Sequence, residues 1–178
     1  MAAPDVRGAR IAPMPTFHPA ALMALHSRDA SYDLVLVAHV LAGLVGLGAV
    51  AAAGVAALAL RRWGPASEPV RRYYRPGVNW AGRILFVVPV LGVVLMAMSH
   101  GDWTFADGWI TAGLVLWAVA AVAGETVLWP AEQRLQAVVG DDRTASPRLG
   151  SQCLRVAGTA SVLTLVLVAA TVVMVVKS

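Results

Sequence analysis

Residues 34–60 decide the fold class; they read LVLVAHVLAGLVGLGAVAAAGVAALAL. The stretch contains no charged side chain, and His39 is its one strongly polar group. About 20 apolar residues in a helix are enough to cross the roughly 30 Å hydrocarbon core of a bilayer. The alternation of polar and apolar residues that is typical of membrane strands is absent. The stretch therefore predicts a transmembrane helix.

Three further apolar stretches, residues 84–103, 109–129 and 154–176, have the composition of spans. Only 13% of the chain is charged and 58% is hydrophobic, whereas soluble domains carry about 25% charge. We expect an all-α integral membrane protein, a four-helix transmembrane bundle over residues 34–178 preceded by an N-terminal tail over residues 1–33. The one cysteine, Cys153, excludes an internal disulfide and a CxxC metal or redox motif.

The arginines predict the orientation. They gather between the first two spans and around the loop before the fourth span, and the link between the second and third spans has no Lys or Arg: Arg61, Arg62, Arg71, Arg72, Arg75, Arg83, then Arg134, Arg143, Arg148, Arg155. Because basic loops stay inside, both termini should lie outside a bacterial inner membrane. The net charge of +4 is then explained by topology and by anionic lipids at the cytoplasmic face, with no need for nucleic acid. Other membrane subunits or a second copy of the chain remain open as partners.

His39 lies on a stripe of small residues. At 100° per residue, six small residues fall within about 60° of His39: Ala42, Gly43, Gly46, Ala53, Gly54 and Ala57. Such a stripe lets another helix or a flat cofactor approach the backbone, so His39 should face the bundle. Two interpretations stay open. His39 is either a packed histidine bonded to a carbonyl or a hydroxyl, such as that of Thr171, or a cofactor ligand.

The end of the second span carries Met96-Ala97-Met98-Ser99-His100. Methionine and histidine together favour a soft metal or haem, and a helix through this segment would put Met96 and His100 on one face. The candidate ligands are therefore His39 and His100 for haem b or copper, with Met96 as a further metal ligand. The alternative is core methionines and an interfacial histidine.

Glu125 is the only acid in the interior of the predicted spans, since Asp102 lies at the very end of the second. Arg83 and Arg155 start the second and fourth spans at a similar depth, which predicts a structural ion pair; a proton-carrying carboxylate is the alternative. Pro89 should kink the second span and release a carbonyl one turn earlier. Residues 64–79 contain three prolines and predict an irregular connection.

Several short motifs together resemble a known family: His39 to Gly43, Pro89 to Gly92, Trp109 with Gly113-Leu114, Trp129-Pro130 with Arg134-Leu135, and Met174 to Lys177. Over about residues 31–178 the chain resembles the bacterial four-helix membrane family called domain of unknown function 2269. That family looks related to the copper-resistance protein D type and to the haem-binding protoporphyrinogen oxidase J type, which place a histidine in the first helix. The resemblance implies His39 as the matching histidine.

Enzyme signatures such as HExxH, GxSxG and the P-loop are absent from the sequence, and no catalytic residue is predicted. Three functions stay open. The preferred one is a small polytopic membrane protein with a structural or accessory role. The others are a haem- or copper-binding membrane protein and a protoporphyrinogen oxidase J-like enzyme.

Overall fold

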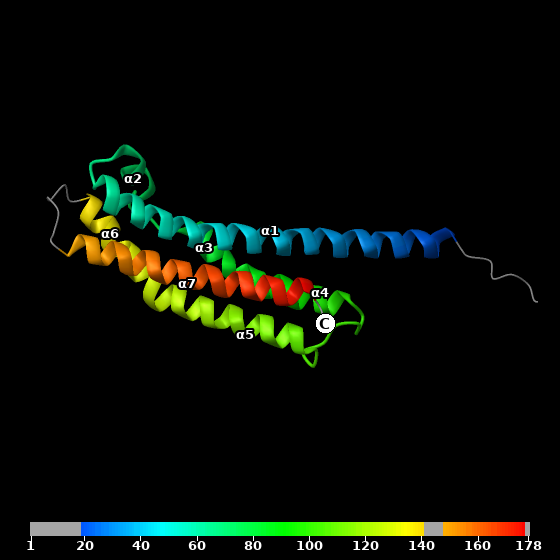
Figure 1. The fold of residues 1–178 in the computed structure, drawn as a ribbon. Helices are drawn as coiled ribbons and strands as arrows, with labels where there is room; N and C mark the ends of the chain where they lie inside the picture. Colours follow the sequence, from blue (N-terminus) through cyan, green and yellow to red (C-terminus); the bar gives the residue numbers. More distant parts are fainter. Residues whose placement is uncertain (1–18, 141–147, 177–178) are drawn as a thin grey trace, which may run out of the picture.

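A computed structural model describes residues 19–140 and 148–176, with side chains from residue 30 onward. The described chain is helical throughout its regular structure, which confirms the all-α class (Figure 1). Its elements are α1 (Pro19–Trp63), α2 (Glu68–Tyr73), α3 (Trp80–Arg83), the 3-10 helix η1 (Ile84–Phe86), α4 (Val87–Met98), α5 (Gly108–Ala123), the π-helix η2 (Gly124–Leu128), α6 (Trp129–Gly140) and α7 (Leu149–Val176). Within these ranges four segments are long and apolar enough to cross a membrane: Ala30–Trp63, Trp80–Met98, Gly108–Gly140 and Leu149–Val176.

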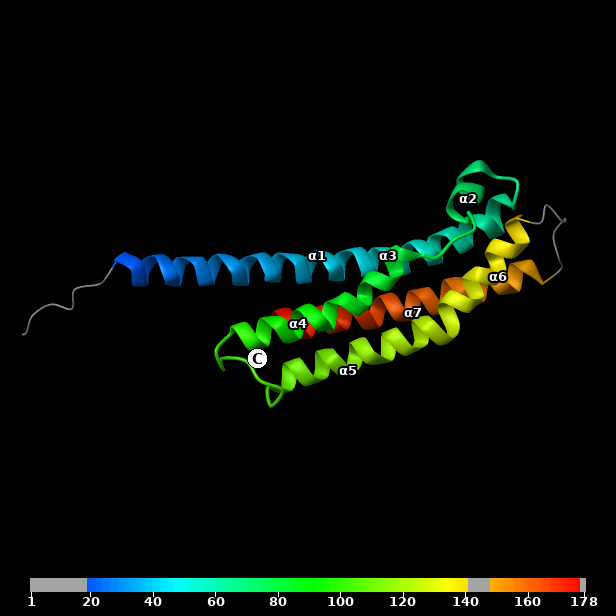
Figure 2. The ribbon, with the colours of Figure 1, turned by 180° about the vertical axis from the view of Figure 1, so that it is seen from behind.

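The spans run antiparallel, so the start of α1 and the end of α7 point the same way (Figures 1 and 2). We call this the terminal end and the opposite one, with α2 and α6, the arginine-rich end. The main packing runs from α4 to α1, from α1 to α7 and from α7 to α5, whereas α4 and α5 scarcely touch. The bundle therefore has a seam, with α3, η1 and α4 on one side and α5 and η2 on the other.

The small-residue stripe of α1 is a packing surface. Ala53 and Ala57 are fully buried. A Cβ built on Gly54 would lie 3.0 Å from the Cβ of Ala160, and one built on Gly46 would lie 2.5 Å from the Leu85 side chain. Small residues at these positions let α1 approach α7 and η1 closely, as the sequence predicted.

Pro89 releases the carbonyl predicted from the sequence, and the structure supplies its partner. Proline has no N–H to donate to the residue four positions earlier, so the Leu85 carbonyl lacks a helical donor. Trp117 Nε1 donates to this oxygen at 2.8 Å. The Trp117 ring also meets Phe86 edge to face, with centroids 6.0 Å apart. These contacts bridge the seam.

At the arginine-rich end, α1 extends past the start of the second span at α3. The segment Trp80–Met98 has 19 residues, roughly 28 Å at 1.5 Å per residue, which matches one bilayer core. Val50 of α1 and Gly82 of α3 line the same recess and so lie at a similar height along the bundle. From Val50, α1 continues to Trp63, roughly 20 Å further. Around this extension lies a buried cluster drawn from four helices and the residue after α2: Leu60, Val70, Tyr74, Leu135, Val139, Leu149, Cys153.

Several expected boundaries differ from the structure. The third segment continues past residue 129 to Gly140, and the fourth begins at Leu149, before residue 154. The second span ends at Met98, so residues 99–103 form a turn and not the end of a span. Residues 64–79 are not wholly irregular, because they contain α2. The expected tail over residues 1–33 is helical from Pro19, where α1 begins; its first 18 residues lie outside the described chain.

Candidate functional site

His39 joins α1 to α4. Its side chain is half-buried, and Nδ1 lies 2.9 Å from the Val88 carbonyl oxygen. Because a carbonyl only accepts, Nδ1 carries a hydrogen and donates it; in the neutral ring the lone pair is then on Nε2. The ring also packs beside Gly92, where a Cβ would lie in van der Waals contact, 3.4 Å from His39 Cε1.

Thr171 is not the partner of His39. Its hydroxyl donates to the Leu167 carbonyl of its own helix at 2.9 Å, so that expectation is wrong. The partner is a carbonyl of α4, the other class of group expected to satisfy a buried imidazole.

His100 lies in an exposed turn and not on α4. Its φ of 56° is left-handed, the conformation that commonly ends a helix. Ser99 Oγ donates to the Met96 carbonyl at 2.8 Å and accepts from the backbone N–H of Trp103 at 3.2 Å. The expectation that Met96 and His100 share a helical face is wrong, because the helix ends at Met98.

His39 contacts α4 at Val88 and lies beside Gly92. Met96 lies one helical turn beyond Gly92, and His100 lies in the turn after α4. Among the residues with described side chains, no three His, Cys, Asp or Glu residues are placed to hold a metal ion.

Glu125 pairs with Arg83 across the seam. Arg83 Nη2 lies 3.6 Å from Glu125 Oε2, and the side chains are 42% and 37% exposed. Glu125 lies in the π-helix η2 and Arg83 ends α3. Arg155, the other arginine expected near Glu125, is exposed on α7. An ion pair exposed to water contributes about 0–1 kcal/mol to stability. The contribution of the Arg83–Glu125 pair therefore depends on whether water or lipid surrounds it.

A buried polar cluster at the arginine-rich end was not predicted. Glu132 is only 3% exposed, and the Tyr73 hydroxyl donates to its Oε1 at 2.8 Å. The Asn79 side chain lines the same recess as this carboxylate. Burial, and secondly the nearby Glu132, raise the pKa of Tyr73, which keeps the phenol protonated as a donor.

Tyr74 differs from its neighbour. It is 1% exposed, and its hydroxyl has no hydrogen-bond partner among the described residues.

A signal for the cluster was present in the sequence: Leu128, Glu132, Leu135 and Val139 recur at helical spacing and are all buried, so Glu132 lies on the packed face of α6.

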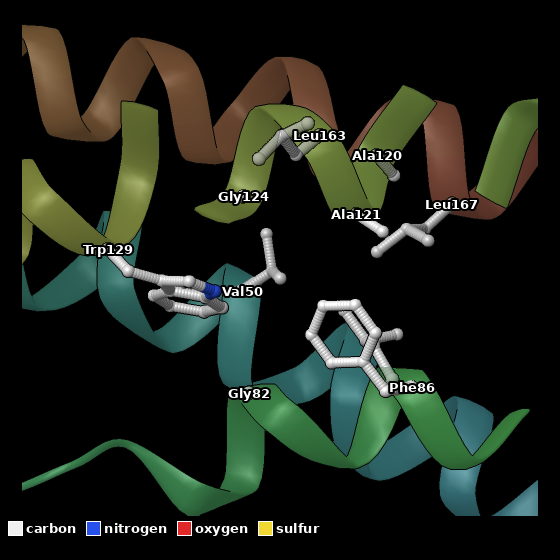
Figure 3. A pocket seen from close by; sticks show the side chains of 10 residues that line it. Val50, Gly82, Phe86, Ala120, Ala121, Gly124, Trp129, Leu163 and Leu167 are labelled. Carbon is white, nitrogen blue, oxygen red and sulfur yellow. The ribbon is translucent and has the colours of Figure 1, made fainter. Parts of the chain in front are cut away.

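Two recesses flank Trp129, which lines both. The apolar slot, with a cavity volume of about 10 Å³, lies in the seam between Phe86, Ala121 and Leu167 (Figure 3). The polar recess, also about 10 Å³, is lined by Asn79, Arg83, Glu132, Gln133 and Gln136 among others. A cavity of this volume holds about one water molecule and is far smaller than the roughly 300–1,000 Å³ of ordinary small-molecule pockets. Neither is lined by His39 or His100.

The family model described as "Predicted integral membrane protein (DUF2269)" matches residues 33–178. The chain belongs to the DUF2269 family. The match covers the four spans together with His39, Arg83, Glu125 and Glu132. No curated protein and no solved structure matches the chain. The family assignment and the four apolar helices together make this DUF2269 protein an integral membrane protein.

Proposed function

We propose that this DUF2269 protein is a structural or accessory component of a bacterial inner membrane and acts as a rigid four-span scaffold. The hydrogen bond from His39 to Val88 carries the proposal, because the most polar group of the first span is used to hold α1 against α4. Two further polar contacts also join separate elements: Arg83 with Glu125, and Tyr73 with Glu132.

The proposed orientation puts the arginine-rich end in the cytoplasm. In support, arginines are exposed on α1, α2 and α6, among them Arg62, Arg71 and Arg134, whereas the turn over residues 99–107 has none. Anionic lipids are attracted to such a surface by about 1 kcal/mol per basic residue. An accessory role further implies other membrane subunits or a second copy of the chain as partners.

A pair of substitutions at His39 tests the scaffold proposal. His39→Asn keeps an N–H donor near the position of Nδ1, and His39→Leu removes it. We expect His39→Leu to lower stability by the loss of one hydrogen bond, about 0.5–1.5 kcal/mol, and His39→Asn to lower it less. The measurement is thermal unfolding of detergent-purified protein. Equal loss in the two variants would count against a packing role for the Nδ1 bond.

A second candidate, haem b or copper binding, is favoured by one observation. Histidines that bind metals usually donate the other ring N–H to a carbonyl or carboxylate, and His39 does so through Nδ1. In that case Nε2 would bind the metal. An enzyme of the protoporphyrinogen oxidase J type depends on the same histidine.

The His39→Asn variant also separates these functions. Protein from cells supplied with haem and copper should be examined for a Soret band and for metal content. A stoichiometric cofactor that is lost in His39→Asn, while the melting temperature is kept, would replace the scaffold proposal by the binding one.

A further inference from the structure

Residues 64–79, which we call the α2 segment, connect the first two spans at the arginine-rich end (Figures 1 and 2). Val70 and Tyr74 are the buried side chains of this segment. Gly64 and Gly77 lie near its two ends, and a Cβ built on either glycine would meet open space. Because glycine leaves the backbone free to change conformation, the segment is held by few side chains and has a flexible residue near each end.

Glu132 of α6 is the polar anchor of the α2 segment. Its side chain is 3% exposed and accepts the hydrogen of the Tyr73 hydroxyl at 2.8 Å. Within the described chain no ion pair involves Glu132, and the arginine that lines the same recess, Arg83, is paired with Glu125. A carboxylate taken out of water without a cation is costly, whereas a protonated carboxyl keeps an oxygen that accepts from Tyr73. Docking of the segment therefore favours the protonated form of Glu132.

The other ionisable groups around Glu132 keep their charge near neutral pH. Burial raises the pKa of the Tyr73 and Tyr74 phenols, so both stay neutral. Cys153 of α7 lies near Tyr74 and also near Arg61 of α1. A thiol ordinarily ionises at about pH 8.5 and a guanidinium above about pH 12. Below about pH 7.5, Glu132 is therefore the member of this cluster whose charge can change.

We propose that the α2 segment is a pH-sensitive switch, docked on the bundle when Glu132 is protonated and released when Glu132 is ionised. Release gives the carboxylate access to water and lets three exposed arginines move relative to the bundle: Arg71, Arg72 and Arg75. The sign follows from proton linkage. Because the docked state holds the proton more tightly than the released state, lower pH favours docking and higher pH favours release. The inference goes beyond the scaffold role and does not depend on it.

Cys153 provides a reporter of the docked state. Its side chain is 0% exposed and lies near Tyr74, so release of the segment should open the thiol to a reagent. One proton changes the docking equilibrium by at most about tenfold per pH unit, starting above about pH 4.3, where a carboxyl in water ionises. We expect the protection of Cys153 to fall by up to about tenfold per pH unit over part of the range from about pH 5 to about pH 7.5.

Thiol labelling of the full chain in lipid nanodiscs tests the proposal. The rate of reaction with dithiodipyridine is divided, at each pH, by the rate for free cysteine, which removes the pH dependence of the thiol itself. Glu132→Gln keeps an acceptor oxygen for Tyr73 and cannot ionise, so Cys153 should be equally protected at every pH. Glu125→Gln, a matched change in the same span, should keep the pH dependence of the unmodified protein.

Two further measurements keep the result specific. In a Cys153→Ser background, Ser151→Cys places the thiol at an exposed position of α7 and should react at nearly the free rate at every pH. Infrared difference spectroscopy of the unmodified protein follows the protonated carboxyl directly and needs no variant to fold. Its C=O band should disappear over the pH range in which protection is lost, while circular dichroism shows that the spans stay helical.

Four results would overturn the proposal. They are protection of Cys153 that does not change with pH, protection that rises with pH, a pH dependence that survives in Glu132→Gln, and a carboxyl band whose loss does not coincide with the loss of protection.

Discussion

Tyr73 and Tyr74 offer a matched test of the packing at the arginine-rich end. Their rings meet edge to face with centroids 5.0 Å apart, and phenylalanine at either position keeps that contact. Tyr73→Phe removes the donor to a carboxyl group that is 3% exposed. Leaving a buried acceptor without its donor costs about 1–3 kcal/mol, and we expect a loss of stability in that range.

Tyr74→Phe should behave in the opposite way. Its hydroxyl is buried without a partner in the described part of the chain, and burying such a group costs about 1–3 kcal/mol in protein experiments. We therefore expect unchanged or higher stability.

The assay for both variants is thermal unfolding in one detergent, followed by circular dichroism. For a chain of this size 1 kcal/mol shifts the melting temperature by about 2–4 °C. Tyr32→Phe, at the other end of the bundle, controls for the loss of a phenol. An equal fall for Tyr73→Phe and Tyr74→Phe would refute the role given to the Tyr73–Glu132 bond. A double-mutant cycle with Glu132→Gln would then show whether the two side chains interact at all.

Two further predictions concern topology and close packing. Cysteine at Ser67 should resist an impermeant thiol reagent in intact cells and cysteine at Thr104 should react; the reverse pattern would invert the proposed orientation, and buried Cys153 gives little background. Gly82→Ala should lower the melting temperature, because its Cβ would lie 2.5 Å from the Trp129 ring and overpacking costs about 1–3 kcal/mol. Gly43→Ala, which meets open space, should be neutral or stabilising, and equal effects of the two changes would contradict the packing described.

Membrane insertion could be predicted because it depends on local composition. Long apolar runs with few charges identify the four spans whatever their partners are. The end of the second span could not be placed by composition, since it is set by hydrogen bonds of Ser99 and by the left-handed backbone of His100. The positions of the residues along their spans predicted that Glu125 lies near Arg83 and Arg155. The choice of Arg83 over Arg155 needed the register between helices, which is a long-range property.

Within the bilayer, hydropathy says little about which face of a helix packs, because lipid and protein interior are equally apolar. The small-residue stripe around Gly54 was informative there for a different reason, the space that it leaves for α7. The sequence of α6 is more polar, so the buried face of this helix can be recognised from its amphipathic spacing. Glu132 lies on that face, and a carboxyl group there needs a donor from another element. The donor is Tyr73 of α2, a residue within a segment whose prolines predict only a loop. In this chain, apolar composition therefore identifies the spans, whereas helical periodicity identifies the buried helix face at the arginine-rich end.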